Sequence, residues 1–501
     1  MGAPNAFAYV ALALFLPLSM LLFRLLPGPL AATLLVLGGE MFLPAEGMLD
    51  LPGLPRLDKD LITYASVLVC MVLFETRRLR AARPMRSLEL LGVALALGGV
   101  ITSLLNSDAL QYGPTRIEGI PLDEVPTAVI ADLLTYVPPF LIGRALHRDG
   151  RDLQRLFAAL AAAGVLYSLF AWVEIWLSPQ LHLWVYGVMH FGFDTTVRWG
   201  GYRPVIFMRS GLAYAIFMVT TLLAATTLAR ARLPVFSLSS RVVAPYLLWL
   251  VVLTRSLASI LFGLFAAPLL YLVRPRVIAR IAVVCALFVT FYPLLRLADV
   301  LPVERITEVF QPFDATRAKS LGGRFGVELE MVKKARERFA FGWGGYSRNW
   351  IFDPVTGERA LIPDGHWVLM LGSRGLVGFG CDFGLMVIPV LLASRRMRRI
   401  PGQRDQILIA GLMLILALRL LDLIPNGRWT SLPTFLGGAL YASSLEMSRP
   451  RRRVAEGGTP KPPPAPEPPA AASPSTPEPE PVKVPRRMSD TLRRRPRGDG
   501  E

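Results

Sequence analysis

Residues 204–229, PVIFMRSGLAYAIFMVTTLLAATTLA, decide the fold class of this chain. The run contains a single charged side chain, Arg209, and about 20 apolar residues are enough for a helix to cross a bilayer. Similar runs recur along the 501 residues, which are 53% hydrophobic and 18% charged, with a mean hydropathy of +0.46. An ordinary soluble domain is about 25% charged. The composition therefore indicates a polytopic membrane protein rather than a set of soluble domains.

The apolar runs predict an all-α transmembrane bundle of about 12 to 13 spans. The spans are expected at residues 7–26, 28–43, 61–75, 88–105, 126–146, 153–178, 204–229, 242–254, 256–273, 277–297, 366–393, 406–422 and 431–446. The three cysteines, Cys70, Cys285 and Cys381, all lie in these runs, so we expect neither a disulfide framework nor a thiolate metal site. With only four histidines, no metal cofactor is expected.

The basic residues set the expected orientation, because lysine and arginine near helix ends are retained on the cytoplasmic side. Three short connections are rich in arginine: Arg77, Arg78, Arg80, Arg83 and Arg86; Arg144, Arg148, Arg151 and Arg155; and Arg395, Arg396, Arg398, Arg399 and Arg404. The expected topology places them inside, with the N-terminus outside and the C-terminus in the cytoplasm. Much of the net charge of +17 is thereby assigned to orientation, so the excess does not predict nucleic acid as a partner.

The chain divides into four predicted parts. Residues 1–297 form an N-terminal transmembrane bundle, residues 298–365 a large periplasmic loop, residues 366–448 the C-terminal transmembrane helices, and residues 449–501 a cytoplasmic tail. The tail is rich in proline and arginine and carries a net charge of +5, and such a composition predicts disorder or polyproline II. Its arginine-rich end could contact anionic lipid or a partner protein, but the composition favours a solvated tail with no specific ligand.

Residues 298–365 form the longest predicted connection between spans and carry ten basic and ten acidic residues. Typical connections have about 4 to 6 residues, and long ordered loops often carry function. Within this one, Phe325, Leu329, Val332 and Phe339 recur at spacings of three, four or seven. This periodicity predicts an amphipathic helix of some four turns that lies on the bilayer surface or caps the bundle.

A second outer connection, residues 178–203, combines aromatic rings with arginine. The rings are Trp184, Tyr186, Phe191, Phe193, Trp199 and Tyr202. They fit either an ordinary interfacial belt or a surface for sugar rings or a prenyl chain. Arg198 and Arg203 end the connection, and Arg209 lies six residues into the next predicted span, where a charge needs a partner.

Four motifs resemble the O-antigen ligase and O-antigen/exopolysaccharide polymerase superfamily of bacterial membrane glycosyltransferases. They are GYRPVIFMRSGLA at residues 201–213, LTRSLAS at 253–259, GGRF at 322–325 followed by RFAFGWGGY at 338–346, and DGHWVLMLGSRGLVG at 364–378. Their order and spacing are similar to the family pattern over roughly residues 198–383. In ligases the position occupied here by Asp364 is typically a histidine, whereas His366 lies two residues further on. This departure favours the repeat-unit polymerase branch of the superfamily.

The resemblance implies a substrate and a set of site residues. The donor would be a polyprenyl-pyrophosphate-linked oligosaccharide, and Arg203, Arg255, Arg324 and Arg198 would bind its pyrophosphate, since arginine supplies forked, permanently charged donors. The catalytic candidates are His366 and Asp364; histidine titrates near neutral pH and suits proton abstraction. Ordinary structural roles remain open for these residues, such as a helix cap for Asp364 and a salt bridge to Glu328 for Arg324.

The resemblance favours one function, and three others stay open. The favoured function is a glycosyltransferase that polymerises lipid-linked repeat units on the periplasmic face of the bacterial inner membrane. The first alternative is an O-antigen ligase that transfers the polysaccharide to lipid A core. The others belong to different classes: a lipid-linked oligosaccharide flippase, and a non-catalytic assembly protein that acts through its cytoplasmic tail. The expected partners are the lipid-linked donor, membrane lipid and a polysaccharide co-polymerase that would bind the tail.

Overall fold

The computed structural model describes residues 3–51, 53, 55–298, 300, 315–345, 347–361, 364–427 and 429–449. Within these ranges the chain is mostly helical, and a helix lies at each of the thirteen predicted spans. They are α1 (Ala6–Leu25), α2 (Gly28–Phe42), α3 (Lys59–Phe74), α5 (Glu89–Leu104), α6 (Val125–Leu146), α7 (Gly150–Leu177), α9 (Gly211–Ala231), α10 (Ser240–Leu253), α11 (Leu257–Leu272), α12 (Pro275–Leu297), α15 (His366–Arg396), α16 (Gln403–Asp422) and α17 (Leu432–Ser448). The expected all-α bundle is thus confirmed at the level of helices. The expected tail lies almost entirely outside the described residues.

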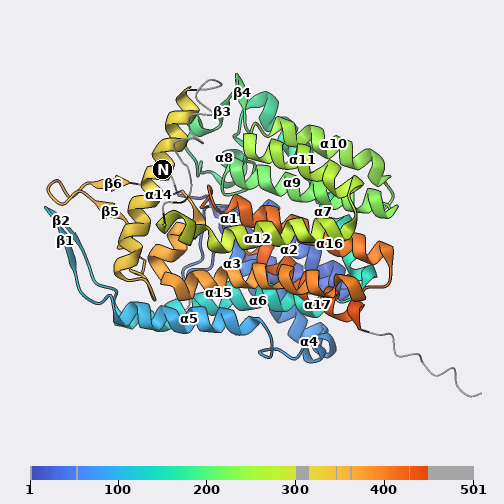
Figure 1. Cartoon of the computed structure of the whole chain (residues 1–501), viewed down its shortest axis with the longest axis horizontal. Coiled ribbons are helices and arrows are strands. Elements are labelled where there is room, and N and C mark those ends of the chain that lie inside the picture. Colours follow the sequence, from blue (N-terminus) through green and yellow to red (C-terminus); the bar gives the residue numbers. More distant parts are fainter. Residues whose placement is uncertain are drawn as a thin grey trace, which may run out of the picture. The chain divides into compact units, whose positions relative to one another are not determined.

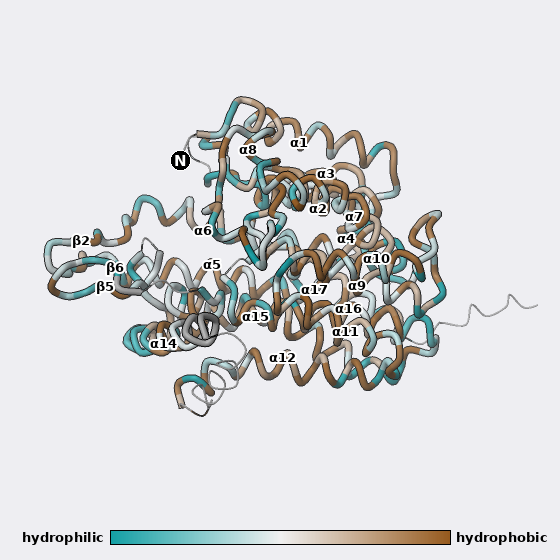
Figure 2. Tube along the Cα trace, turned by 90° about the horizontal axis from the view of Figure 1, so that it is seen from above, coloured by the Kyte–Doolittle hydropathy of each residue, from teal (hydrophilic) through white to brown (hydrophobic). Residues whose placement is uncertain are grey.

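Six of the described helices are long and apolar enough to cross a membrane: α1, α6, α7, α9, α12 and α15. Helices α2, α5, α10 and α11 are apolar but shorter. Figure 1 shows most of these helices side by side along one direction, and Figure 2 shows that apolar residues predominate along them. A lipid core offers no partner for backbone polar groups, so a bundle of helices is the arrangement that this composition requires.

Helix α9 forms the centre of the bundle. It packs against α7, α10, α11 and α16, and its side chains from Ala213 to Ala229 are buried. Ser210 caps its first turn by accepting a hydrogen bond from the Ala213 amide at 3.2 Å. The helix therefore begins at Gly211 and not at residue 204 as the sequence predicts, because the segment before it is held by other contacts, among them Glu174, which accepts from the Val205 and Ile206 amides.

Helix α14 (Ala315–Glu337) lies crosswise at one end of the bundle (Figure 1). A helix lies in the connection where the sequence predicts one, and it is longer than the predicted four turns. Its buried face includes Met331, Val332 and Ala335, whereas Leu329 is only half-buried. Glu328 joins this face because the buried Arg296 of α12 forms an ion pair with it at 3.6 Å and the Tyr292 hydroxyl donates to it at 3.1 Å.

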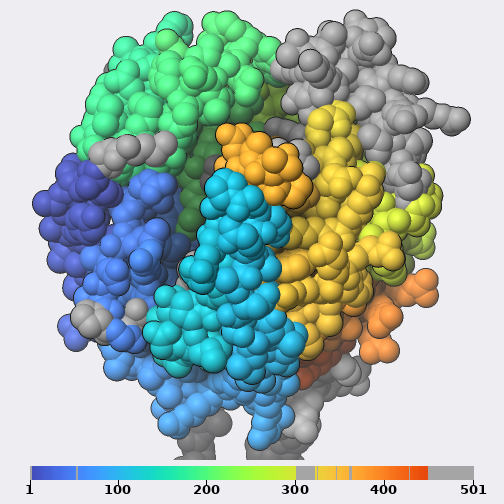
Figure 3. Space-filling view, turned by 90° about the vertical axis from the view of Figure 1, so that its left-hand side faces the viewer, coloured from blue at the N-terminus to red at the C-terminus, as the bar shows by residue number. Residues whose placement is uncertain are grey.

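Three short hairpins complete the fold: β1–β2 (Leu110–Tyr112, Thr115–Ile117), β3–β4 (Val197–Arg198, Gly201–Tyr202) and β5–β6 (Ile351–Phe352, Arg359–Leu361). The first and third contact each other. The Tyr112 and Phe352 rings stack at 5.2 Å, and the Thr115 hydroxyl donates to the Gly357 carbonyl at 2.8 Å. Figure 3 shows this face of the molecule, with the cyan β1–β2 hairpin beside the orange β5–β6 hairpin and the yellow α14. Segments more than 200 residues apart in sequence thus form one surface layer.

The remaining short helices occupy connections: α4 (Thr76–Ala82), α8 (Leu181–Tyr186) and the single turns η1 (Leu122–Glu124), η2 (Phe193–Thr195) and η3 (Met397–Arg399). Helix α4 contains part of the first arginine-rich connection and contacts α6 near its end. Arg144 of α6 donates to the Arg83 carbonyl at 3.2 Å, and Arg148 pairs with Glu446 of α17 at 2.7 Å. The arginine-rich connections therefore gather at one end of the bundle, as the positive-inside pattern predicts.

Candidate functional site

The most extensively held feature at the opposite end is the turn Ala340–Gly345, here called the docked turn, which contains the Gly-Trp-Gly motif. Its backbone pairs with the backbone of α15: the Trp343 amide donates to the Gly372 carbonyl at 2.8 Å and the Gly344 amide to the Ser373 carbonyl at 2.9 Å. The Leu376 amide in turn donates to the Phe339 carbonyl at 2.8 Å. Two of the four sequence motifs are therefore packed directly on each other.

Glycine is required on both sides of this contact. Gly342 and Gly375 have φ angles of 73° and 64°, a region that residues with a Cβ rarely adopt. A Cβ on Gly342 would also lie 2.6 Å from the Gly375 amide nitrogen. The two backbones approach too closely for any side chain between them.

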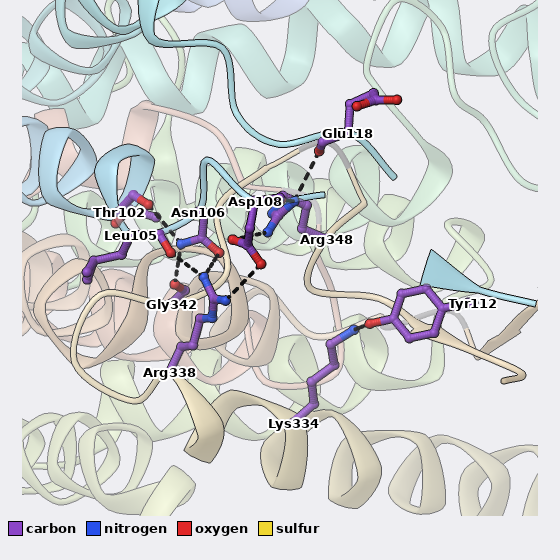
Figure 4. Close-up of polar contacts among 10 residues, drawn as sticks. All are labelled: Thr102, Leu105, Asn106, Asp108, Tyr112, Glu118, Lys334, Arg338, Gly342 and Arg348. Carbon is purple, nitrogen blue, oxygen red and sulfur yellow. Dashed lines mark hydrogen bonds and ion pairs between the residues drawn. The ribbon is translucent and has the colours of Figure 1, made fainter. Parts of the chain in front are cut away.

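The end of α5 and Asn106, which follows that helix, hold the other side of the docked turn (Figure 4). The Thr102 hydroxyl donates to the Phe341 carbonyl at 2.6 Å, and the Asn106 amide donates to the Gly342 carbonyl at 3.1 Å. Arg338 donates to the Asn106 side chain at 2.6 Å and to the Leu105 carbonyl. Thr102 and Asn106 thus satisfy carbonyls of the docked turn, and Arg338 satisfies the carbonyl of Leu105 at the end of α5.

Arg348 is the fully buried anchor of the same layer. It donates to the carbonyls of Asp108 at 2.7 Å and Glu118 at 3.0 Å, and its guanidinium lies 3.2 Å from the Asp108 carboxylate. Lys334, at the end of α14, donates to the Tyr112 hydroxyl at 3.2 Å and to the Trp350 carbonyl. Burial lowers the pKa of Lys334 to about 8, since the charged ammonium loses solvation there.

A bend in α15 creates the environment of His366. The helix is interrupted at Gly375, and its two parts fold back on each other. His366 Nε2 lies 2.7 Å from the Asp382 carboxylate, although a straight helix would separate residues 16 positions apart by about 24 Å. The bend therefore brings together two residues that a continuous span would keep far apart.

His366 is the first residue of α15, and it packs between the later part of that helix and the connection that joins α16 to α17. Its ring stacks on Phe383 at 5.8 Å and on Trp429 at 6.1 Å, and its amide donates to the Leu423 carbonyl at 3.0 Å. Asp382 is fully buried, and its second carboxylate oxygen has no hydrogen-bond partner among the described residues. The carboxylate can therefore hold the imidazole in one orientation, as in histidine-based general-base sites.

An ion pair lies directly at the bend. Arg374, the residue before Gly375, contacts the Asp132 carboxylate of α6 at 2.8 Å. The guanidinium passes over Gly99 of α5, where a Cβ would not fit. The bend is thus fixed by one charge pair to α6 and by the docked turn above it.

Three of the four predicted pyrophosphate-binding arginines come together at the α10–α11 turn. Arg203 donates to the Arg255 carbonyl at 3.0 Å, and Arg255 donates to the carbonyls of Arg198 at 2.5 Å and Trp199 at 3.0 Å. Arg255 has a φ of 53° and separates α10 from α11, which confirms the predicted break between these helices. We call these three residues the arginine group.

The fourth predicted arginine and the acidic candidate have different positions. The backbone of Arg324 belongs to α14, and its side chain lies outside the described residues. Asp364 is exposed, and its carbonyl lies beside Gly427. The N-cap residue of α15 is Gly365, one position after Asp364. The structure associates His366 with a buried acidic partner.

Arg209 is not inside a span as the sequence predicts, because it precedes α9. It pairs with Asp58 at 2.7 Å and Asp60 at 2.9 Å, both at the start of α3. Beside them the buried Lys59 donates to the Glu40 carbonyl at 2.9 Å and to the Phe207 carbonyl at 3.3 Å. Two carboxylates, those of Asp58 and Asp60, therefore offset the cost of placing the charge of Arg209 here.

The sequence reasoning missed several residues of this region. They are Asp382, Asp132, Arg374, Asp58, Asp60, Lys59 and Trp429. Asp132 and Asp382 were detectable, because each lies in the middle of an apolar run, where an ionisable residue is a functional candidate by default. Their partners were not detectable, because the partners lie 16 to 242 residues away along the chain.

Within the described ranges, no group of three or more histidine, cysteine, aspartate or glutamate residues could hold a metal ion. A scan against models of protein families gave no match for the chain, and a search of curated proteins gave none either.

Proposed function

We propose that the protein is a membrane glycosyltransferase that polymerises polyprenyl-pyrophosphate-linked repeat units into O-antigen or exopolysaccharide. The observation that carries this proposal is the contact between His366 and the buried Asp382 at a bend of α15. The bend is formed by one family-like motif, residues 364–378, and is fixed by another, the docked turn. A positioned imidazole can act as the general base that takes the proton from an attacking sugar hydroxyl.

The proposed orientation places the arginine-rich end of the bundle in the cytoplasm. The docked turn, α14 and the arginine group would then lie on the periplasmic side of the bacterial inner membrane, where an undecaprenyl-linked donor is presented. The pairing of Arg148 with Glu446 supports a cytoplasmic C-terminus, because it joins an arginine-rich connection to the end of the last helix.

In the proposed reaction, a hydroxyl of the acceptor sugar attacks the anomeric carbon of the donor. The bond between that carbon and the pyrophosphate oxygen breaks, and the configuration at the carbon inverts. His366 takes the hydroxyl proton, and Asp382 stabilises the imidazolium that results. Arg203, Arg255 and Arg324 would stabilise the charge that develops on the leaving pyrophosphate, and Arg198 would help to bind it. Loss of one such preorganised donor costs about 2.7 to 4 kcal/mol elsewhere.

The test is transfer activity of purified protein with a synthetic lipid-linked repeat unit. We expect His366→Ala to abolish formation of the product ladder while the protein folds normally. His147→Gln is the matched control, because His147 is also buried but bonds Thr33 at 2.9 Å elsewhere in the bundle. Full activity of His366→Ala would refute the role of His366 as the base.

A deletion strain separates the polymerase from the ligase, because the two defects leave different glycans on the carrier lipid. A strain without a polymerase leaves single repeats on the carrier lipid or core, whereas a strain without a ligase leaves long chains on the carrier. The position of Asp364, at which ligases of the similar family typically have histidine, supports the polymerase.

One observation favours a second candidate, a flippase or transporter for the lipid-linked oligosaccharide. The break at Gly375 makes α15 a discontinuous helix, and transporters often build their binding sites from such helices. If a deletion strain accumulated no intermediate on the outer face, the transporter would be supported and both transferases contradicted.

A further inference from the structure

We infer that a pocket at the arginine-rich end of the bundle binds the phosphate of an anionic lipid headgroup. The pocket has a volume of about 360 Å³ and lies between the start of α12 and the end of α15. Its lining includes four arginines, Arg276, Arg280, Arg395 and Arg398, together with Ala279 and Ser394. It lies outside the proposed active site and does not depend on the proposed reaction.

Some arginines at this end of the bundle have a carboxylate partner, whereas the four pocket arginines have none among the described residues. Arg144 pairs with the buried Glu89, Arg148 pairs with Glu446 at 2.7 Å, and Arg78 lies 3.7 Å from Asp152. None of the four pocket arginines forms an ion pair with any carboxylate in the part of the chain that the structure describes. Four positive charges around one cavity repel one another, and an anion in the cavity would relieve this repulsion.

The start of α12 adds to the positive potential. The helix has 23 residues, begins at Pro275, and no side chain caps its first turn. The amide groups and the dipole at a helix N-terminus favour an anion. Arg276 and Arg280 are four positions apart on this helix, so they lie on the same face and both reach the cavity.

Guanidinium groups identify the chemistry of the ligand. Each can donate two parallel hydrogen bonds to a phosphate, a geometry that favours phosphate over a single carboxylate oxygen. Basic pockets between helices on the cytoplasmic side of membrane proteins are a known means of binding lipid headgroups.

The surface next to the pocket indicates a lipid rather than a free phosphate. Leu272, at the end of α11, is 75% exposed, and Val284, two to three turns into α12, is 66% exposed. Val277, one residue after Arg276, is also exposed. Apolar side chains that remain exposed on a membrane helix are available to acyl chains, so a lipid could place its phosphate in the pocket and its chains against this surface.

The experiment measures the thermal unfolding temperature of the purified full chain in detergent, with phosphatidylglycerol or phosphatidylcholine added. We expect phosphatidylglycerol to raise this temperature by several degrees and phosphatidylcholine to leave it nearly unchanged. In the variant R276Q/R280Q/R395Q/R398Q, more than half of the rise should be lost.

The matched control is R77Q/R80Q/R86Q/R404Q, which removes the same charge from equally exposed arginines at the same end of the bundle that do not line the pocket. It should retain the rise. An equal loss in both variants would overturn the proposal, because it would show a diffuse charge effect. If the fourfold pocket variant does not fold, the double variant R280Q/R398Q serves, with about half of the rise expected to be lost and an undiminished rise counting against the pocket.

Inorganic phosphate and pyrophosphate separate the two sources of the ligand. We expect neither, at millimolar concentration, to reproduce the effect of phosphatidylglycerol. If either does so in the wild type but not in the pocket variant, the site binds a free anion and the lipid assignment is wrong.

Discussion

The docked turn and the arginine group are both built from loop residues at the same kind of position, the ends of helices, yet they are held very differently. The docked turn is fixed by backbone pairs to α15, by hydrogen bonds from Thr102 and Asn106, and by the glycine contact of Gly342 with Gly375. The guanidinium of Arg255, by contrast, is held by two loop carbonyls and stays half-buried. The first arrangement combines backbone pairs, side-chain hydrogen bonds and a close glycine contact, whereas the second includes hydrogen bonds from Arg203 and Arg255 to loop carbonyls.

The difference suggests a division of labour. Contacts to the docked turn contribute mainly to the stability and shape of the region, because they satisfy backbone groups. Contacts within the arginine group contribute mainly to the placement of charge. Substitutions in the two places should therefore have opposite effects on folding and on activity.

The largest expected effect follows from Gly375→Ala. The substitution combines a strained backbone at a φ of 64° with overlap against the Ala340 backbone. Each of these costs about 1 to 3 kcal/mol, so we expect a loss of about 4 kcal/mol in the free energy of unfolding. The readout is the thermal unfolding temperature and the amount of protein in the membrane.

Gly380→Ala is the control for this prediction. Gly380 lies in the same helix, its φ is not positive, and no atom outside its own helical turn lies within 4 Å of the place that a methyl group would take. The substitution should leave stability unchanged or slightly raised. If Gly375→Ala and Gly380→Ala unfolded at the same temperature, the docked turn would not be rigid.

The next largest effect is expected at the arginine group, and it concerns activity rather than folding. Under the proposed function, Arg203→Ala should lower transfer about 100-fold or more, as removal of one preorganised donor does elsewhere, with protein levels unchanged. Arg324→Ala should behave in the same way. The measurement is chain formation in cells together with the unfolding temperature of each purified variant.

Arg336→Ala provides the matched control, since Arg336 is exposed on α14. Its chain formation should equal that of the wild type. Polymer of normal length in both Arg203→Ala and Arg324→Ala would refute the pyrophosphate site and leave the arginine group with a structural role alone.

The sequence predicted the helices of this chain well, and the reason is physical. Each apolar run must satisfy its own backbone hydrogen bonds, so its length and composition determine a helix without knowledge of its neighbours. The sequence also predicted the break at Arg255 and the presence of a helix near Val332. Helix boundaries were less accurate at α9, where a capping serine, not hydropathy, determines the start.

The candidate site was predicted only in part. Hydropathy averages over about one span, so it could not reveal that α15 turns back at Gly375 and brings Asp382 to His366. Arg209 was recognised as a charge that needs a partner, but Asp58 and Asp60 reach it from about 150 positions earlier in the chain. Local patterns identify such charges, whereas the fold alone identifies their partners.

The smallest predicted effect concerns Lys334 and tests the docked region by pH. A lysine in an unfolded chain has a pKa of about 10.4, whereas burial lowers the pKa of Lys334 to about 8. Between these values the unfolded state binds more protons than the folded state, so the fold becomes more stable as pH rises through this window. Below pH 8 Lys334 is protonated in both the folded and the unfolded state, so it adds no pH dependence to the free energy of unfolding. The full cost of burying its charge is then present.

The measurement compares wild type with Lys334→Met between pH 7 and pH 10. The difference between their free energies of unfolding should change in favour of the wild type across this range, by on the order of 1 kcal/mol, because solvent screens much of the shift at this half-buried position. Other titrating groups cancel in the difference. A difference that is constant with pH would mean that Lys334 does not lose its solvation when its ammonium bonds Tyr112 and Trp350, and the surface layer of β1–β2 and α14 would then be looser than the docked turn beside it.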